Sequence, residues 1–291
     1  MTQAVRREIT LQLPHIRLGG WISGQDDKPL LLALHGWLDN ANSFAPLSDA
    51  LDDYRLLAID WPGHGLSDRR DGSYPLHWID YLYDLHGVVT TLIARGDKPF
   101  AIVAHSLGGI VASSYLASHP DACDALVLIE ALGPLTERPG RAKERLVKSF
   151  ADHLALAATE PKIYRDFDTV VEARHRLTGL EKGAAMQIIA RNFIEVEGGV
   201  TARTDPRLKL DSPLRLTPSH GEAFVRDLAL PSLLLIGDAG FDKLKQAAEP
   251  AKALFGQLEV VSMRGCHHLH MTHASDAAAA IRAFLARVAT P

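Results

Sequence analysis

The sequence has few cysteines, no long apolar run and no apolar block at its start. It holds two cysteines, Cys123 and Cys266, in 291 residues. Two are too few for a disulfide framework, so we expect buried free thiols. No apolar run approaches the roughly 20 residues that span a bilayer, and the opening MTQAVRREITLQLP lacks the apolar block of a secretory signal. These absences predict a soluble, cytoplasmic protein without a membrane partner.

Clusters of positive charge are also missing. The chain has 31 basic and 35 acidic residues, which gives a formal net charge of -4. Since no basic stretch could follow a phosphate backbone, we expect no nucleic-acid partner. The hydrophobic content of 47% is enough for a sizeable core. Because low-complexity linkers and internal repeats are absent too, the sequence favours one domain with an insertion over two independent domains.

Short apolar runs alternate with stretches of helix length. This alternation is typical of strands joined by crossover helices in a mostly parallel sheet. Residues 8–13 and 15–23 alternate in polarity and predict an antiparallel pair at the sheet edge. Further strands are predicted at residues 29–34, 54–60, 99–105, 125–130, 231–236 and 258–262, and helices at 43–51, 76–95, 107–118, 243–255 and 275–287.

The pattern changes in the middle of the chain. Residues 133–228 are charged and helical in character, with several proline and glycine breaks and no convincing buried strand. Strand-like runs resume afterwards, which indicates that the segment interrupts one sheet. We therefore predict an α/β core of residues 1–132 and 229–291, a helical cap of residues 133–228, and a small-molecule substrate bound between cap and sheet.

The segment PFAIVAHSLGGIVASSYLASHP carries the most specific motif. A buried strand runs directly into Ser106 and then into a helix, which is the arrangement of a nucleophile elbow. So tight a turn requires small residues two positions before and after the serine, here Ala104 and Gly108. The turn would project the Ser106 hydroxyl above the sheet and leave the Leu107 N–H to bind an oxyanion. The competing interpretation is a helix N-cap serine.

With its neighbouring motifs, the sequence resembles the α/β-hydrolase superfamily over nearly the whole chain outside the insertion. LLLALHGWLDN is similar to the family's strand followed by His-Gly, and LLAIDWPGHGLSD to a structural landmark of the family. The resemblance implies the α/β-hydrolase fold, an eight-stranded sheet, and the backbone N–H of Trp37 as a second oxyanion donor. HGWLDNANSF and GCHHLHM resemble the serine-hydrolase-like proteins.

A nucleophilic serine needs a general base and an acid that orients it. In this fold the histidine follows the last strand, where MRGCHHLHMTH offers four. The family's Gly-x-His spacing implies that His267 is the base and leaves His268 as the alternative. A metal site in HHLH is disfavoured, because no carboxylate or cysteine stands at the usual zinc spacing. No cofactor is implied.

The acid is marked less clearly. Family members usually place an aspartate three residues beyond the glycine that closes the penultimate strand, but that offset from Gly237 holds Gly240. Other members use a carboxylate at the end of the strand after the elbow helix, which implies Glu130. A glutamate that ends a buried apolar strand costs free energy unless it is paired, so we favour Glu130. Asp242 and Asp238 stay open as alternatives.

The predicted reaction is hydrolysis of a small carboxylic ester or related acyl compound through an acyl-enzyme, with Ser106, His267 and Glu130 as the triad. A serine at the elbow argues against haloalkane dehalogenases and epoxide hydrolases, which resemble this chain but use aspartate there. Carbon–carbon bond hydrolysis and cofactor-free haloperoxidation stay open, because they use the same triad. A ligand-binding protein on a hydrolase scaffold also stays open. An exposed cap helix could mediate a homodimer or open as a lid.

Overall fold

Apolar runs of five residues form the centre of the sheet. The computed structural model describes residues 4–290 and contains an eight-stranded sheet in the order β1-β2-β4-β3-β5-β6-β10-β11. Every residue of β3, β5 and β6 is buried, as expected for strands with helices on both faces. The strands are β1 (Arg7–Gln12), β2 (Arg17–Ser23), β3 (Leu30–Leu34), β4 (Arg55–Ile59), β5 (Ala101–His105), β6 (Ala125–Ile129), β10 (Leu228–Gly237) and β11 (Phe255–Met263).

Strand directions follow the predicted pattern. β1 pairs antiparallel with β2, and β2 pairs antiparallel with β4. The other neighbours in the sheet are parallel. The eight-stranded, mostly parallel sheet with an antiparallel opening pair is therefore confirmed. Parallel strands bring their carboxyl ends to one edge, so the loops after β3, β5, β6 and β11 meet there.

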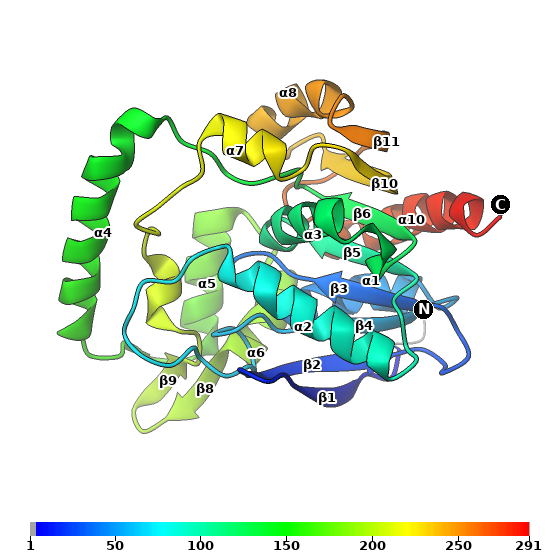
Figure 1. The fold of residues 1–291 in the computed structure, drawn as a ribbon. Helices are drawn as coiled ribbons and strands as arrows, with labels where there is room; N and C mark the ends of the chain where they lie inside the picture. The colour runs from blue at the N-terminus through cyan, green and yellow to red at the C-terminus, as the bar shows by residue number, and fades with distance from the viewer. Residues whose placement is uncertain (1–3, 291) are drawn as a thin grey trace.

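Helices cover both faces of this sheet (Figure 1). Apolar side chains of α2, α3 and α8 pack in one core cluster, and those of α1 and α10 in a second. Residues 78–79, predicted as helix, form a turn before α2, because the N–H groups of Asp80, Tyr81 and Leu82 donate to carbonyls three residues earlier rather than four. The helix predicted over 243–255 ends at Ala251, since Pro250 removes a helical hydrogen bond. The helices are α1 (Ala45–Ala50), α2 (Asp80–Ala94), α3 (Leu107–Ser118), α8 (Asp242–Ala251), α9 (Leu269–Thr272) and α10 (Ala274–Val288).

The insertion between β6 and β10 contains strands as well as helices. It holds α4 (Ala142–Ala157), α5 (Phe167–Thr178), α6 (Lys182–Asn192) and α7 (Pro218–Ala223), together with a three-stranded antiparallel sheet of β7 (Ile163–Tyr164), β8 (Phe193–Val196) and β9 (Gly199–Ala202). The sequence predicted a helical segment without a convincing buried strand, so this small sheet adds to that description. Its strands are two to four residues long and mostly half-buried, so no apolar run marks them.

Two arginines of the insertion fix it to the carboxyl edge of the sheet. Arg191 of α6 is buried, and its Nε lies 2.9 Å from Oδ2 of Asp60, the residue after β4. Arg174 of α5 pairs with Asp39 in the loop after β3. The insertion thus covers that edge, and in Figure 1 it lies on the side of the molecule away from the two chain termini.

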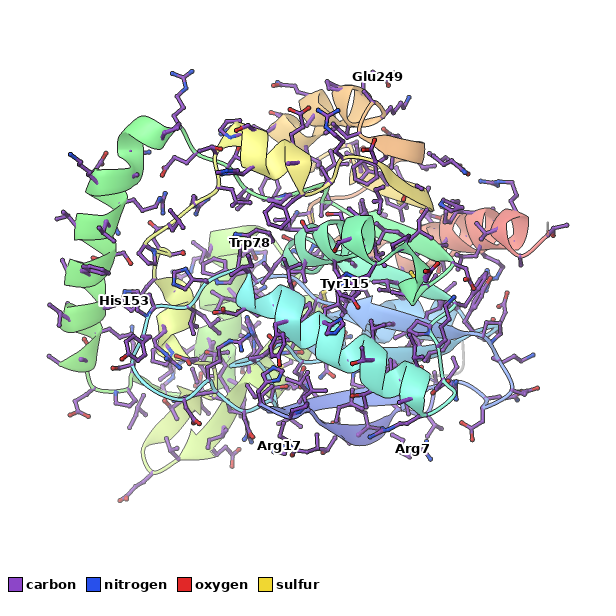
Figure 2. The ribbon with its side chains drawn as sticks, in the orientation of Figure 1. Arg7, Arg17, Trp78, Tyr115, His153 and Glu249 are labelled. Atoms are coloured by element: carbon purple, nitrogen blue, oxygen red, sulfur yellow. The ribbon has the colours of Figure 1, made fainter. Side chains whose placement is uncertain are left out.

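Arg7, Arg17 and Glu249 are exposed and lie on the outside of the core in Figure 2. Among residues 4–290, none of the helices combines the length and the apolar character that a bilayer crossing requires.

Candidate active site

The turn between β5 and α3 has the strained backbone of an elbow. Ser106 sits there with φ 50° and ψ −114°, a region that residues with side chains rarely occupy. A Cβ on Gly108 would lie 2.2 Å from the carbonyl oxygen of Leu34, so the helix can approach β3 this closely only with glycine at that position. The Ser106 N–H donates to the Ile129 carbonyl at 3.0 Å. The surrounding strands therefore hold the strained turn in place.

The predicted oxyanion donors lie in neighbouring loops. Leu107 is the first residue of α3, so its N–H has no acceptor within the helix. Leu34 of β3 pairs with Ala104 of β5, which puts the loop that carries Trp37 beside the elbow. The Trp37 indole donates to the Leu208 carbonyl at 2.7 Å and ties this loop to the insertion.

Glu130 follows β6 directly and is buried, with 3% of its surface exposed. Its Oε1 accepts the Gly237 N–H at 2.7 Å, and its Oε2 accepts the Phe241 N–H at 3.3 Å. His267 Nδ1 also lies 3.3 Å from Oε2. Burial raises the pKa of Glu130, but these hydrogen bonds outweigh burial and bring the pKa below its ordinary value. The carboxylate is therefore ionised at neutral pH.

Gly240 occupies the position at which family members usually have the acid, and its surroundings leave no room for a side chain. A Cβ built on Gly240 would lie 2.3 Å from Oε1 of Glu130. A side chain at position 240 and the Glu130 carboxylate would thus compete for one space. Glycine at position 240 therefore leaves room for the side chain of Glu130.

The other two candidate acids make different contacts. Asp238 Oδ1 accepts the Gly265 N–H at 2.9 Å and so shapes the turn before the histidine loop. Asp242 pairs with Lys245 at 3.3 Å, and 86% of its side chain is exposed. Within residues 4–290, Glu130 is the carboxylate that lies within hydrogen-bond distance of His267.

One ring nitrogen of His267 contacts Glu130, and the ring faces a cavity. The ring centroid lies 4.4 Å from that of Phe241, and the side chain is about one-fifth exposed. Burial lowers the pKa of His267, and the contact with Glu130 raises it only in part, so the pKa lies below its ordinary value. The neutral imidazole predominates at pH 7, as a general base requires.

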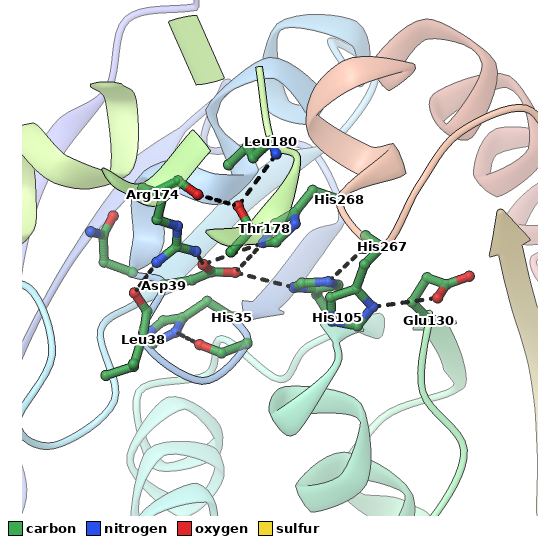
Figure 3. A network of polar contacts seen from close by, with 12 residues as sticks. His35, Leu38, Asp39, His105, Glu130, Arg174, Thr178, Leu180, His267 and His268 are labelled. Carbon is green, nitrogen blue, oxygen red and sulfur yellow. Dashed lines mark hydrogen bonds and ion pairs between the residues drawn. The ribbon is translucent and has the colours of Figure 1, made fainter. Parts of the chain in front are cut away.

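The alternative base, His268, turns to another carboxylate (Figure 3). Its Nε2 lies 3.2 Å from Oδ2 of the buried Asp39. His105 lies between the two regions: its Nδ1 is 3.4 Å from the same Oδ2, and its Nε2 donates to the His267 carbonyl at 2.8 Å. Arg174 binds the other carboxylate oxygen of Asp39. Four residues from the core and the insertion thus form one buried network behind His267.

This network revises the sequence argument about metal ligands. Asp39, His105 and His268 offer ligand-type atoms within 4.8 Å of one another, although Asp39 lies 229 residues before His268 in the chain. Carboxylate and imidazole are ligands that zinc accepts. Arg174, however, already supplies the positive charge that balances Asp39. The contacts with His268 and His105, with a smaller contribution from Arg174, bring the pKa of Asp39 well below its usual range against the effect of burial.

Two further histidines are structural. His64 is buried and accepts the Leu38 N–H at 3.2 Å on Nε2, and burial lowers its pKa to about 4. His270 is fully buried and packs against Phe44 and His105, with ring centroids 5.2 and 4.3 Å away. Burial likewise brings the pKa of His270 well below its ordinary value.

A cavity of about 970 Å³ opens beside the elbow. Ser106, Glu130 and His267 all line it. Its remaining walls come from α3, from the loop after β6, from the region of α7, and from α8 with the segment that follows it as far as Phe255. The candidate nucleophile, base and acid therefore lie at the wall of one cavity.

Comparison with known proteins agrees with this architecture. Residues 29–274 match the family model described as the alpha/beta hydrolase fold. The chain is 27% identical over 303 residues to a serine hydrolase-like protein of Danio rerio, covering 98% of this chain and 90% of that protein. It is 30% identical over 252 residues to 2-(acetamidomethylene)succinate hydrolase of Mesorhizobium japonicum, covering 82% of this chain and 81% of that protein.

A solved structure of a hypothetical protein from Pseudomonas aeruginosa PAO1 is also similar. Its TM-score is 0.87 at 34% identity, and the alignment covers 97% of this chain and 99% of that one. The match of the family model to most of the chain confirms the resemblance drawn from the elbow and the His-Gly loop. The protein belongs to the α/β hydrolase fold family and has serine hydrolase-like proteins among its relatives.

Proposed function

We propose that the protein is a serine hydrolase that cleaves carboxylic esters or related acyl compounds through an acyl-enzyme. The observation that carries the proposal is the 3.3 Å contact between His267 Nδ1 and Glu130 Oε2, at the wall of a cavity that Ser106 also lines. A carboxylate on Nδ1 keeps the proton on that nitrogen and leaves Nε2 free to accept one from a serine.

Each group has one role in the proposed reaction. Ser106 Oγ attacks the substrate carbonyl while His267 Nε2 takes the hydroxyl proton, and the N–H groups of Trp37 and Leu107 donate to the oxyanion. His267 then protonates the leaving alcohol, which departs and leaves the acyl group on Ser106. The same histidine activates water for attack on the acyl-enzyme. Glu130 stabilises the imidazolium in both steps.

A rival proposal is a ligand-binding protein that keeps the fold without turnover. The cavity serves either role, so the choice depends on the reactivity of Ser106. A fluorophosphonate probe and p-nitrophenyl acetate test that reactivity. We expect the parent protein to be labelled and to cleave acetate, and Ser106→Ala to do neither.

The matched control is Ser118→Ala, which removes a serine at the exposed end of the same helix. This variant should be labelled like the parent. Absence of both labelling and turnover in a folded parent protein would favour the binding protein. Labelling with no ester cleavage would direct the search to the other reactions of a serine triad.

A further inference from the structure

The cavity beside Ser106 is apolar over most of its wall. Apart from the candidate triad, its lining includes aliphatic side chains from four parts of the fold: Ile110, Leu132, Leu135, Val225, Leu244 and Leu254. Three further charged residues line the cavity: Asp242 points largely into solvent, Glu222 pairs with Arg226, and Lys243 is exposed on α8. The wall thus offers little to a polar substrate and much contact area to a hydrocarbon.

The lining of the cavity includes residues from just before α8 to just after it. Phe241, just before α8, has its ring 4.4 Å from that of His267 at the carboxyl edge of the sheet. The chain then runs back to Phe255, where β11 begins at the opposite edge. Both Phe241 and Phe255 line the cavity, as do residues between them. The apolar wall therefore leads from the triad along the side of the sheet.

The length of this wall sets a length for its ligand. α8 has ten residues, which at 1.5 Å per residue gives about 15 Å. Carbon–carbon bonds of about 1.5 Å advance an extended zigzag chain by about 1.25 Å per carbon. The wall thus matches a chain of about twelve carbons. Small residues along it, Ala247 and Ala253, leave the groove open for such a chain.

We infer that the groove along α8 holds an unbranched acyl chain, and that the substrates are esters of medium-chain fatty acids with about 8 to 12 carbons. The inference rests on the proposed acyl-enzyme, and it replaces the expectation of a small acyl group with a longer one. Transfer of a methylene from water to an apolar wall contributes about twofold to fourfold to kcat/KM. Each carbon added to the acyl chain should therefore increase kcat/KM until the groove is filled.

A p-nitrophenyl ester series from acetate to palmitate tests this inference. In the parent protein, kcat/KM should rise at least about 100-fold from acetate to decanoate and then level off. Ala247→Trp fills the groove from an exposed helix position, so the ratio of decanoate to acetate activity should fall at least about 30-fold. Ala253→Trp lies farther along the wall, so it should reduce kcat/KM only for esters with longer acyl chains. Ala253→Trp also tests the inference if Ala247→Trp does not fold.

Gln246→Trp is the matched control, because Gln246 is exposed on the same helix and does not line the cavity. Its chain-length profile should equal that of the parent. A flat or falling profile in a parent protein that cleaves acetate would overturn the inference and leave the proposed function intact. If no ester is cleaved, the proposed function fails, and laurate binding tests the groove by itself. Laurate should bind the parent more tightly than Ala247→Trp, and equal or absent binding would overturn the inference.

Discussion

Two buried carboxylates flank the histidine loop, and they differ in what surrounds them. Glu130 contacts His267 and lines the cavity, and its other partners are backbone N–H groups. Asp39 contacts His268 and His105 in a sealed region, and a guanidinium from the insertion balances its charge. The first carboxylate lies behind a histidine whose ring faces the cavity. The second is in a place where a fixed charge holds loops together.

This difference shows that two adjacent histidines can contact separate carboxylates. His267 contacts Glu130 and His268 contacts Asp39, although the centroids of the two rings lie only 5.4 Å apart. A pair that looks redundant in sequence therefore divides into one group that faces the cavity and one that faces the core. His105 joins the two regions through the His267 carbonyl. Substitutions on the two sides should have different consequences for rate and for stability.

Glu130→Gln should have the largest effect on rate. The glutamine oxygen can keep the Gly237 N–H, which puts the amide NH₂ opposite Nδ1 of His267. The NH₂ would donate to Nδ1 and shift the ring proton to Nε2, so the imidazole could no longer accept the proton of Ser106. We expect kcat/KM for esters to fall about 10³- to 10⁴-fold, as measured by steady-state kinetics.

The pH profile adds a second measurement for the same variant. Protonation of His267 stops catalysis, so in the parent protein kcat/KM should fall as pH drops through the His267 pKa, which lies below its ordinary value. Glu130 favours the charged imidazole, so its neutralisation lowers that pKa and moves the acid limb to lower pH. Glu259→Gln, a surface substitution on β11, is the control. A limb that moves to higher pH would contradict the assigned contact.

Asp39→Asn should affect stability more than rate. The change leaves Arg174 without its charged partner in a mostly buried site, which costs about 3 kcal/mol of unfolding free energy. The His267 loop should shift slightly through His105, with a loss of about tenfold in kcat/KM. Denaturant unfolding and kinetics measure the two effects. A loss of rate as large as that of Glu130→Gln would remove the distinction between the two carboxylates.

The pH dependence of this destabilisation has a definite sign. The folded-state pKa of Asp39 is lowered, so its contribution to stability is complete above the unfolded pKa of about 3.9 and disappears as pH falls through the folded pKa. The gap between parent and Asp39→Asn should be full at pH 7 and shrink below pH 4. Asp53→Asn is the control, because it breaks a surface pair with Arg282 and should cost under about 1 kcal/mol.

The core of the fold could be predicted because its elements carry strong local patterns. The helix expected at residues 107–118 has those bounds in the structure, since a strained turn begins it and His119-Pro120 follows it. The small sheet of the insertion could not be predicted in the same way. β8 and β9 have four residues each and mostly half-buried positions, so they show neither a buried run nor a clear alternation.

The residues of the site also differ in how well the sequence predicts them. Ser106 has a local motif, whereas the contact of His267 with Glu130 joins loops 137 residues apart and was inferred from a family resemblance. The Asp39 network carried no signal, because nothing in the sequence near Asp39 indicates that its carboxylate is buried or that Arg174 reaches it. Gly240 was noted as a departure from the family, and its closeness to Glu130 gives that departure a physical reason.

Asp238→Asn should have the smallest effect. The asparagine carbonyl can still accept the Gly265 N–H that Asp238 accepts at 2.9 Å, so the turn before His267 should persist. That N–H also lowers the pKa of Asp238, and the lost charge faces solvent, where it is screened. We expect kcat/KM to change less than about twofold, and the same for the exposed Asp242→Asn. If Asp238→Asn instead lost activity by orders of magnitude while Glu130→Gln did not, the acid of the triad would be Asp238. The contact at Glu130 would then only hold the loop, which is the role that the comparison gives to Asp39.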